Sequence, residues 1–244
     1  MSGHSKWANI KHHKAAQDAK KANVFTKIAK DITIAARGGG GDPGSNFRLR
    51  LVMDKARAVN MPNENISRAI KRGTGELKDA ANVEEVLYEA YGPGQIAMLI
   101  KAVTDNKNRA LGDVRNILNK NGGKMAEGGG VAWQFEQVGN LIVSVGDRGK
   151  DSLEALIIES GAKDYRRGDE NYFVFTMAKD LQIVKENLEK AGIVIEEAGL
   201  IYLAKQPMAI DVHTKMDYER LLAALDESDD VTEVYDNLEN GAME

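Results

Sequence analysis

The sequence contains no cysteine. This absence excludes disulfides, thiolate-bound metal sites, iron–sulfur clusters and a cysteine nucleophile. No apolar run approaches the roughly 18 residues that a membrane-spanning helix requires. The first residues are polar and basic, so they lack the apolar stretch of a secretory signal peptide. Together these features favour a cytoplasmic protein that does not contact a membrane.

The sequence also lacks a recognisable set of catalytic residues. Among its histidines only His213 lies outside the N-terminal region, and no nucleophile can be paired with a base and an orienting group. His4, His12 and His13 lack the helical spacing to a carboxylate that is typical of metal-binding helices. We therefore predict no enzymatic activity, no metal and no cofactor, with a metal-dependent hydrolase as the remote alternative.

Charge is divided unevenly along the chain. Residues 1–80 contain 16 lysines and arginines against 7 acidic residues, a net charge of +9. Residues 81–244 contain 17 against 30, a net charge of −13, which gives −4 overall. An asymmetry of this size indicates a basic module that binds a polyanion. The alternative is that two oppositely charged parts of the protein attract each other.

Three helices are predicted in the basic part. From about residue 17, apolar residues recur at steps of three and four until the glycine-rich run 38–44, and this spacing places Lys20 and Lys27 on the opposite, outer face. A second helix is predicted over 45–59 and a third over 64–72, where cations crowd the last turns. Residues 1–80 are therefore predicted to form a basic helical domain that binds nucleic acid.

The remaining residues alternate between strand-like and helical patterns. Helices are predicted over 108–120, 151–160 and 181–191 and around Tyr218 to Leu225, and strands over 86–91, 95–103, 131–135, 141–145, 172–176, 193–203, 208–212 and 231–235. Such alternation predicts an α+β fold with two small sheet domains, ferredoxin-like or similar. Residues 131–205 look complete by themselves, so we predict that they are inserted in a middle domain formed by 81–130 and 206–244.

The predicted nucleic-acid contacts are mainly cations of the N-terminal segment and of the three helices. Lysine and arginine neutralise phosphates, and a tryptophan face can stack on a base. The set comprises Lys6, Trp7, Lys11, His12, Lys14, Lys20, Lys21, Lys27, Arg37, Arg48, Arg50, Lys55, Arg57, Arg68, Lys71 and Arg72. The alternative for the first residues is a solvated terminus with the tryptophan packed against the first helix.

A second anion site is predicted where a strand meets a helix. Lys107 and Arg109 would add positive charge to the backbone donors at the start of that helix. The alternative is an ordinary helix cap by Asp105 or Asn106. The glycine runs 38–41 and 128–130 do not fit phosphate-binding loops, so we interpret both as flexible linkers.

Several motifs resemble the YebC/PmpR family. The first is GHSKWANIKH at residues 3–12, followed by KAAQDAK at 14–20. Further matching segments are FTK at 25–27, GGGDP at 39–43, RLR at 48–50, DKA at 54–56, NMP at 60–62, RAI at 68–70, YE at 88–89, YGPG at 91–94, DN at 105–106 and NR at 108–109. The resemblance covers the whole chain and is strongest over residues 1–135.

The resemblance implies a helical N-terminal bundle followed by two α+β domains, one inserted in the other. It also implies a nucleic-acid-binding regulator of gene expression, because members of the family are described as transcriptional regulators that bind DNA. The family is similar to the mitochondrial translational activator of cytochrome oxidase subunit I, and bacterial members are linked to the ribosome and to relief of stalling on proline-rich sequences. The alternative partners are therefore ribosomal RNA and ribosomal proteins.

Three positions depart from the family pattern. His13 stands in place of a common arginine, Phe47 in place of a proline and Gly130 in place of a serine. His13 would be mostly neutral at pH 7, which puts one phosphate contact in doubt. Phe47 removes a helix-starting proline but supplies an apolar anchor.

Neutralising Lys11, Lys14, Lys20 and Lys27 together is expected to abolish nucleic-acid binding while the fold stays intact. Because about four phosphates would no longer be neutralised, the slope of log K against log salt concentration should flatten by roughly 3 to 4. Binding titrations across a salt series would measure this change. Unchanged binding would mean that the charge asymmetry has another role.

Overall fold

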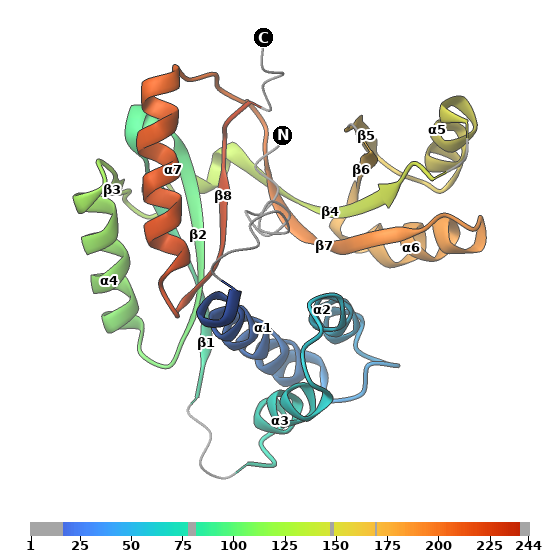
Figure 1. The fold of residues 1–244 in the computed structure, drawn as a ribbon, viewed down its shortest axis with the longest axis horizontal. Coiled ribbons are helices and arrows are strands. Elements are labelled where there is room, and N and C mark those ends of the chain that lie inside the picture. Colours follow the sequence, from blue (N-terminus) through green and yellow to red (C-terminus); the bar gives the residue numbers. More distant parts are fainter. Residues whose placement is uncertain (1–16, 78–81, 147–148, 169, 240–244) are drawn as a thin grey trace. The chain divides into compact units, whose positions relative to one another are not determined.

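The computed structural model describes residues 17–77, 82–146, 149–168 and 170–239, with side chains from residue 22 onward. The chain divides into two compact units (Figure 1). Residues 136–203 form one unit, and the residues up to 135 form the other together with those from 204 onward. The predicted helical domain and the predicted middle domain therefore fall within a single unit. The two units are described separately.

Three helices open the larger unit: α1 (Gln17–Gly39), α2 (Phe47–Ala58) and α3 (Asn63–Gly73). Asn46 begins α2, because its side-chain oxygen accepts a hydrogen bond from the Leu49 N–H. Its side-chain amide also donates to the carbonyls of Ala35 and Gly40, which ties the α1–α2 connection down. The linker interpretation of residues 38–41 is therefore wrong, since Gly38 and Gly39 end α1 and the next residue, Gly40, is hydrogen-bonded to Ala36 and Asn46.

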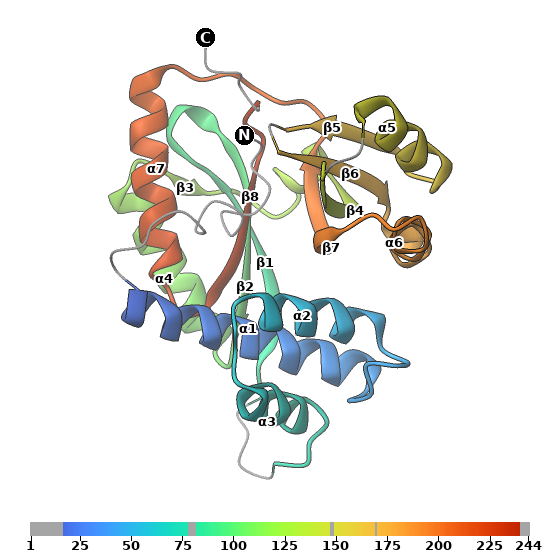
Figure 2. The same cartoon turned by 45° about the vertical axis from the view of Figure 1, so that its right-hand side comes forward.

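The predicted inward faces of these helices meet in one apolar core. Ile32 of α1, Leu49 of α2 and Ile66 of α3 are all buried there. Full burial of each such side chain contributes roughly 1.5–3 kcal/mol. α1 contacts both other helices along its length, which makes it the central element of the three (Figure 2).

A four-stranded antiparallel sheet continues this unit, with strand order β3-β1-β2-β8. Its strands are β1 (Glu84–Tyr91), β2 (Ala97–Thr104), β3 (Lys124–Met125) and β8 (Val231–Asp236). Helices α4 (Lys107–Lys120) and α7 (Val212–Asp226) cover one face, where Met98 and Ile100 of β2 pack against Leu118 and Leu221. α1 contacts β2 and β8. On β2, Lys101 meets α1, whereas its neighbour Ile100 points into the core with α4 and α7, so α1 lies against the other face of the sheet.

The smaller unit has the chain order β4-α5-β5-β6-α6-β7 and the sheet order β5-β6-β4-β7, which is the ferredoxin-like arrangement. Its elements are β4 (Phe135–Ser144), α5 (Lys150–Glu159), β5 (Asp164–Arg167), β6 (Asn171–Met177), α6 (Leu181–Lys190) and β7 (Ile195–Ala204). On the helix-covered face, Leu141, Val174, Leu153 and Leu188 are fully buried. The predicted α+β class is therefore confirmed.

The strand predicted at 131–135 is wrong, whereas the one predicted at 141–145 is the end of a longer strand. Ala132–Gln134 form a short 3₁₀ turn, and β4 begins only at Phe135. The turn forms because the N–H groups of Gly129, Val131 and Ala132 all donate to the carboxylate of Glu89. The glycine run 128–130 is held by these bonds, so its interpretation as a flexible linker is wrong.

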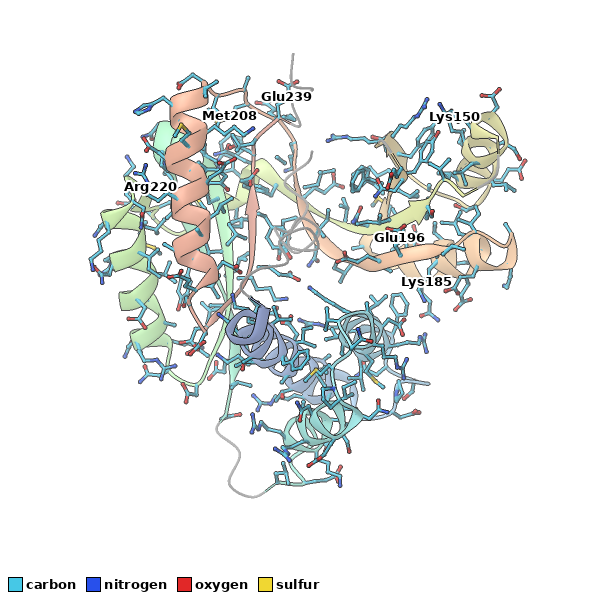
Figure 3. All side chains as sticks on the ribbon, in the orientation of Figure 1. Lys150, Lys185, Glu196, Met208, Arg220 and Glu239 are labelled. Carbon is cyan, nitrogen blue, oxygen red and sulfur yellow. The ribbon has the colours of Figure 1, made fainter. Side chains whose placement is uncertain are left out.

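The predicted strand at 208–212 is also wrong in extent. Met208 forms an isolated bridge with Leu238, and its carbonyl accepts a hydrogen bond from the Glu239 N–H (Figure 3). The chain then turns, since the Asp211 carboxylate caps α7 by accepting from the Thr214 N–H. Strands β3 and β5 carry too few apolar residues to give a strand pattern.

Close packing of α1 on α3 predicts a sharp effect at Gly73. A Cβ at this position would lie 2.5 Å from the Thr33 carbonyl oxygen and 2.7 Å from the Ala36 Cβ. Gly73→Ala should therefore lower the free energy of unfolding by about 1–3 kcal/mol. The control is Gly112→Ala within α4, where an added Cβ has no neighbour within 4 Å. This substitution should raise the free energy of unfolding by about 0.5–1 kcal/mol, because alanine favours a helix interior more than glycine does. Urea unfolding would measure both, and equal effects would contradict the close packing.

Candidate nucleic-acid interface

Part of the predicted interface lies outside the described residues. The helix α1 is described from Gln17, but side chains only from residue 22. The predicted contacts without described side chains are Lys6, Trp7, Lys11, His12, Lys14, Lys20 and Lys21. The geometry of the interface is therefore built from the cations of α1, α2 and α3 that follow them.

Lys27 is not on an outer face, so its predicted exposure is wrong. The residue is only 3% exposed, and its ammonium lies 3.2 Å from a carboxylate oxygen of Asp226 at the end of α7. It also donates to the Asp226 carbonyl. Burial lowers the pKa of Lys27, and the charge of Asp226 acts against that shift. Lys27 must therefore be left out of any variant designed to weaken binding without harming the fold.

Lys30, one turn further along α1, makes an equivalent contact that was not predicted from the sequence. Its ammonium lies 2.7 Å from a carboxylate oxygen of Asp230 and donates to the Asp229 carbonyl. The available signal was the acidic run 226–230, which complements two lysines three residues apart on one helix face. These pairs dock the first half of α1 on the α7–β8 turn.

A largely buried cluster of four charged side chains continues this contact onto the sheet. Lys101 of β2 lies 3.3 Å from Asp31 of α1 and 3.4 Å from Glu233 of β8. The other carboxylate oxygen of Glu233 lies 3.1 Å from Lys55 of α2, and Tyr235 donates its hydroxyl to Glu233. We call Asp31, Lys55, Lys101 and Glu233 the buried charge cluster.

The pKa shifts in this cluster follow from burial and charge. Burial alone would raise the pKa of Glu233, but Lys101 and Lys55 outweigh it and lower that pKa to about 2. Burial raises the pKa of Asp31, and Lys101 offsets only part of the increase. For Lys101, burial opposes the charged form, while Asp31 and Glu233 raise its pKa overall. The charged forms of Glu233 and Lys101 are therefore favoured, whereas burial favours the neutral form of Asp31.

Three predicted arginine contacts are also occupied within the chain. Arg48 of α2 pairs with Glu85 of β1, and Arg37 at the end of α1 donates to the Val83 carbonyl. Arg50 donates to the carbonyl of Pro43 at 2.7 Å and places its guanidinium 5.4 Å from the centre of the Phe47 ring. The apolar anchor predicted for Phe47 thus also carries a cation–π contact.

The remaining predicted cations stand out from the helices. Arg57 pairs with Asp54 one turn away, and Arg68 pairs with Glu64, both on exposed surface. Such surface pairs contribute little and exchange readily with another anion. Lys71 and Arg72, in the last turn of α3, are exposed and have no ion pair with the described residues. We call Arg57, Arg68, Lys71 and Arg72 the exposed cation group.

The predicted second anion site is closed by carboxylates. Lys107 pairs with Glu84, and Arg109 bonds to Asp105 at 2.9 Å and Asp230 at 2.8 Å. Asn106 caps α4 by accepting from the Arg109 N–H, so the capping alternative describes this turn. Both cations of the predicted site are thus paired with carboxylates of the chain.

The arrangement offers a charged surface. In the part of the chain that the structure describes, no group of three or more histidines and acidic residues is placed to hold a metal ion. None of its described helices is long and apolar enough to cross a membrane. The exposed cation group places positive charge at separate points on α2 and α3, where it can pair with anions such as phosphates.

The fold and this surface define an α+β protein with a basic helical N-terminal part that is suited to binding a polyanion. Two family models match the chain: the TACO1/YebC protein N-terminal domain over residues 5–76, and the TACO1/YebC second and third domain over residues 83–238. The chain belongs to the TACO1/YebC family, which confirms the resemblance found in its motifs.

Relatives match over nearly their full length. A protein named "Probable transcriptional regulatory protein" from Thermoanaerobacter pseudethanolicus is 48% identical over 240 residues, which cover 98% of this chain and 97% of that protein. A protein of the same description from Chlorobaculum tepidum is also 48% identical, over 98% of this chain and 95% of its own. The crystal structure of a conserved hypothetical protein from Aquifex aeolicus matches with a TM-score of 0.86 at 42% identity, over 96% of this chain and 97% of that one.

The buried charge cluster predicts a specific pH dependence of stability. Glu233→Gln should lower the free energy of unfolding at pH 7 by about 3 kcal/mol, because it removes the carboxylate that pairs with both Lys55 and Lys101 in a largely buried site. The pKa of Glu233 in the folded protein, about 2, lies below its value in the unfolded chain, about 4.3. Its stabilising effect is therefore present above about pH 4.3 and is lost as the pH falls toward 2.

Urea unfolding at pH 7 and at pH 3 would measure this difference. The control is Glu64→Gln, which removes a carboxylate from the exposed pair with Arg68 and should change stability by less than about 1 kcal/mol. The two variants should differ clearly at pH 7 and less at pH 3. If Glu233→Gln matched Glu64→Gln at pH 7, the cluster would not hold α1 and α2 to the sheet.

Proposed function

We propose that this protein is a nucleic-acid-binding regulator of gene expression that acts by binding and not by catalysis. The observation that carries the proposal is the exposed cation group on α2 and α3. Most other described cations of the helical region are paired with carboxylates of the chain or hydrogen-bonded to its carbonyls. Lys71 and Arg72 keep their charge directed to solvent, and they follow a strongly basic N-terminal segment in the same part of the chain.

The mode of binding that fits this surface is contact with phosphates. Isolated lysine and arginine side chains on helix surfaces neutralise backbone charge, which gives affinity and a strong dependence on salt. Reading a base sequence needs several side chains at one groove, such as arginine or asparagine directed at base edges. The described cations are spread over two helices, so we propose a positioning role for them, with sequence selection supplied elsewhere.

Double-stranded DNA is the first candidate target. Relatives that share 45–48% identity carry names that describe them as transcriptional regulatory proteins, which supports a DNA target for this chain. The second candidate is ribosomal RNA together with ribosomal proteins, in a protein that aids translation. The spread of cations over separate helices is compatible with this second target, because it suits an irregular RNA surface as well as a regular duplex.

Lys71→Gln combined with Arg72→Gln should weaken binding and make it less sensitive to salt. Because about two phosphates would no longer be neutralised, the slope of log K against log salt concentration should fall by roughly 2. Anisotropy of labelled duplex DNA and co-sedimentation with purified ribosomes, each across a salt series, would measure the change for both targets. Competition with excess duplex DNA in the ribosome assay would identify the preferred one.

A matched control removes the same charge from another helix. Arg115 and Lys120 are exposed on α4, which covers the face of the sheet opposite α1. Arg115→Gln combined with Lys120→Gln should leave the salt slope unchanged. Equal slopes for the two double variants would show that net charge, and not the surface of α3, governs binding, and the proposed interface would then be wrong.

A further inference from the structure

Trp133 is an aromatic side chain held open to solvent. It is 65% exposed, on the 3₁₀ turn at Ala132–Gln134 that precedes β4. A tryptophan usually buries most of its large apolar surface and keeps only its N–H near a polar partner. The position of this indole is therefore unusual, and neither the fold nor the proposed function so far uses it.

The indole is fixed in place by hydrogen bonds. Its Nε1 donates to the Gly130 carbonyl at 3.0 Å, and the Tyr91 hydroxyl donates to the same carbonyl at 3.2 Å. The carbonyl of Trp133 itself accepts a bond of 2.8 Å from the Lys205 ammonium. The ring thus has a defined direction, so binding a partner on its face costs little conformational entropy.

The loop beneath the indole is equally well anchored. Glu89 of β1 accepts three backbone bonds, at 2.7 Å from Gly129, 2.6 Å from Val131 and 2.7 Å from Ala132. Burial would raise the pKa of Glu89, but these three donors lower it, so the carboxylate is ionised at neutral pH. An anionic side chain of β1 therefore fixes the backbone of the turn that carries the indole.

Two lysines flank this aromatic position. Lys205 is exposed and reaches the Trp133 carbonyl, while Lys124 of β3 is exposed and places its ammonium 5.7 Å from the centre of the Tyr91 ring. Proteins that bind single strands combine aromatic faces, on which bases stack, with cations that follow the backbone. We infer that Trp133, together with Lys124 and Lys205, is a stacking platform for one unpaired base of a single-stranded nucleic acid.

This assignment rests on the proposed function, which supplies the class of partner, a nucleic acid. It adds a second contact with that partner, at the turn before β4 and not on the three N-terminal helices. A duplex is a poor fit, because its bases already stack on one another and only a splayed base exposes a free face. A protein partner is less well matched, because lysine is depleted at protein interfaces and two exposed lysines lie near the indole. Single-stranded RNA and single-stranded DNA share the required chemistry and are compared directly in the test.

Indole fluorescence tests the assignment directly, since the chain contains only two tryptophans. In full-length Trp7→Phe protein, Trp133 is the single indole emitter. Titration with 12-nucleotide oligouridine, the matching oligodeoxythymidine and a 12-base-pair duplex should quench the emission with one or both single strands and not with the duplex. The two single strands show whether the sugar matters.

Labelled-oligonucleotide anisotropy then separates stacking from shape. In the Trp7→Phe background, Trp133→Leu should weaken single-strand binding about fivefold to hundredfold, while Trp133→Phe, which keeps an aromatic face, should stay within about threefold. Circular dichroism would confirm that both variants fold. The quenching experiment does not depend on these two variants, because it uses the Trp7→Phe protein alone. Lack of quenching, equal quenching by the duplex, or unchanged affinity of Trp133→Leu would overturn the inference.

The same measurements distinguish its failure from that of the proposed function. Duplex or ribosome binding that weakens in the Lys71→Gln and Arg72→Gln variant, with no change in Trp133 emission, would leave the helical interface intact and reject only the stacking platform. If no nucleic acid bound at any salt concentration, both proposals would be wrong.

Discussion

The buried charge cluster is the constraint on which the arrangement of the larger unit depends. Asp31 of α1 and Lys55 of α2 meet Lys101 and Glu233 of the sheet at ion-pair distance in a largely buried site. Buried charges are costly unless each finds a partner, so a small shift of α1 or α2 would leave at least one of them unpaired. An apolar contact would tolerate sliding by a fraction of a turn, whereas these four charges permit one register. The cluster thus decides which cations of the helices turn inward and which stay exposed.

The uneven charge along the chain consequently serves two purposes. Lys27, Lys30 and Lys55 bind acidic residues near the C-terminal end of the same unit, so two oppositely charged parts do attract each other. Lys71 and Arg72 take no part in this attraction, and they supply the surface that we propose for a polyanion. The two interpretations of the charge asymmetry are therefore complementary. Only the residues of the second group are useful for testing binding, because neutralising the first group would unfold the contact between helix and sheet.

Sequence patterns predicted the elements well where one period dominates, as in α3 and in the β1–β2 hairpin. They failed where a contact distant in the chain sets the conformation. The turn before β4 depends on the bond from the Ala132 N–H to Glu89, which lies 43 residues earlier in the chain. No local sequence pattern contains that information. Likewise, the helical spacing correctly set Lys27 apart from the main apolar stripe, but which face meets another element depends on the tertiary contact with Asp226. The exposure of Trp133 likewise depends on a distant contact, since the Glu89 carboxylate holds its turn in place.

Strand β1 connects both proposed contacts with nucleic acid. Side chains alternate along a strand, so Glu85 and Glu89 lie on the same face, roughly 13 Å apart. Glu85 pairs with Arg48 of α2, and Glu89 holds the loop of Trp133. That face is opposite the one covered by α4 and α7, because Tyr88 and Ala90 point into the apolar core with those helices. Arg48 of α2 and the turn of Trp133 thus contact one face of one strand. A nucleic acid that engaged both proposed surfaces would need a structured and an unpaired segment, which is a property of folded RNA more than of a uniform duplex.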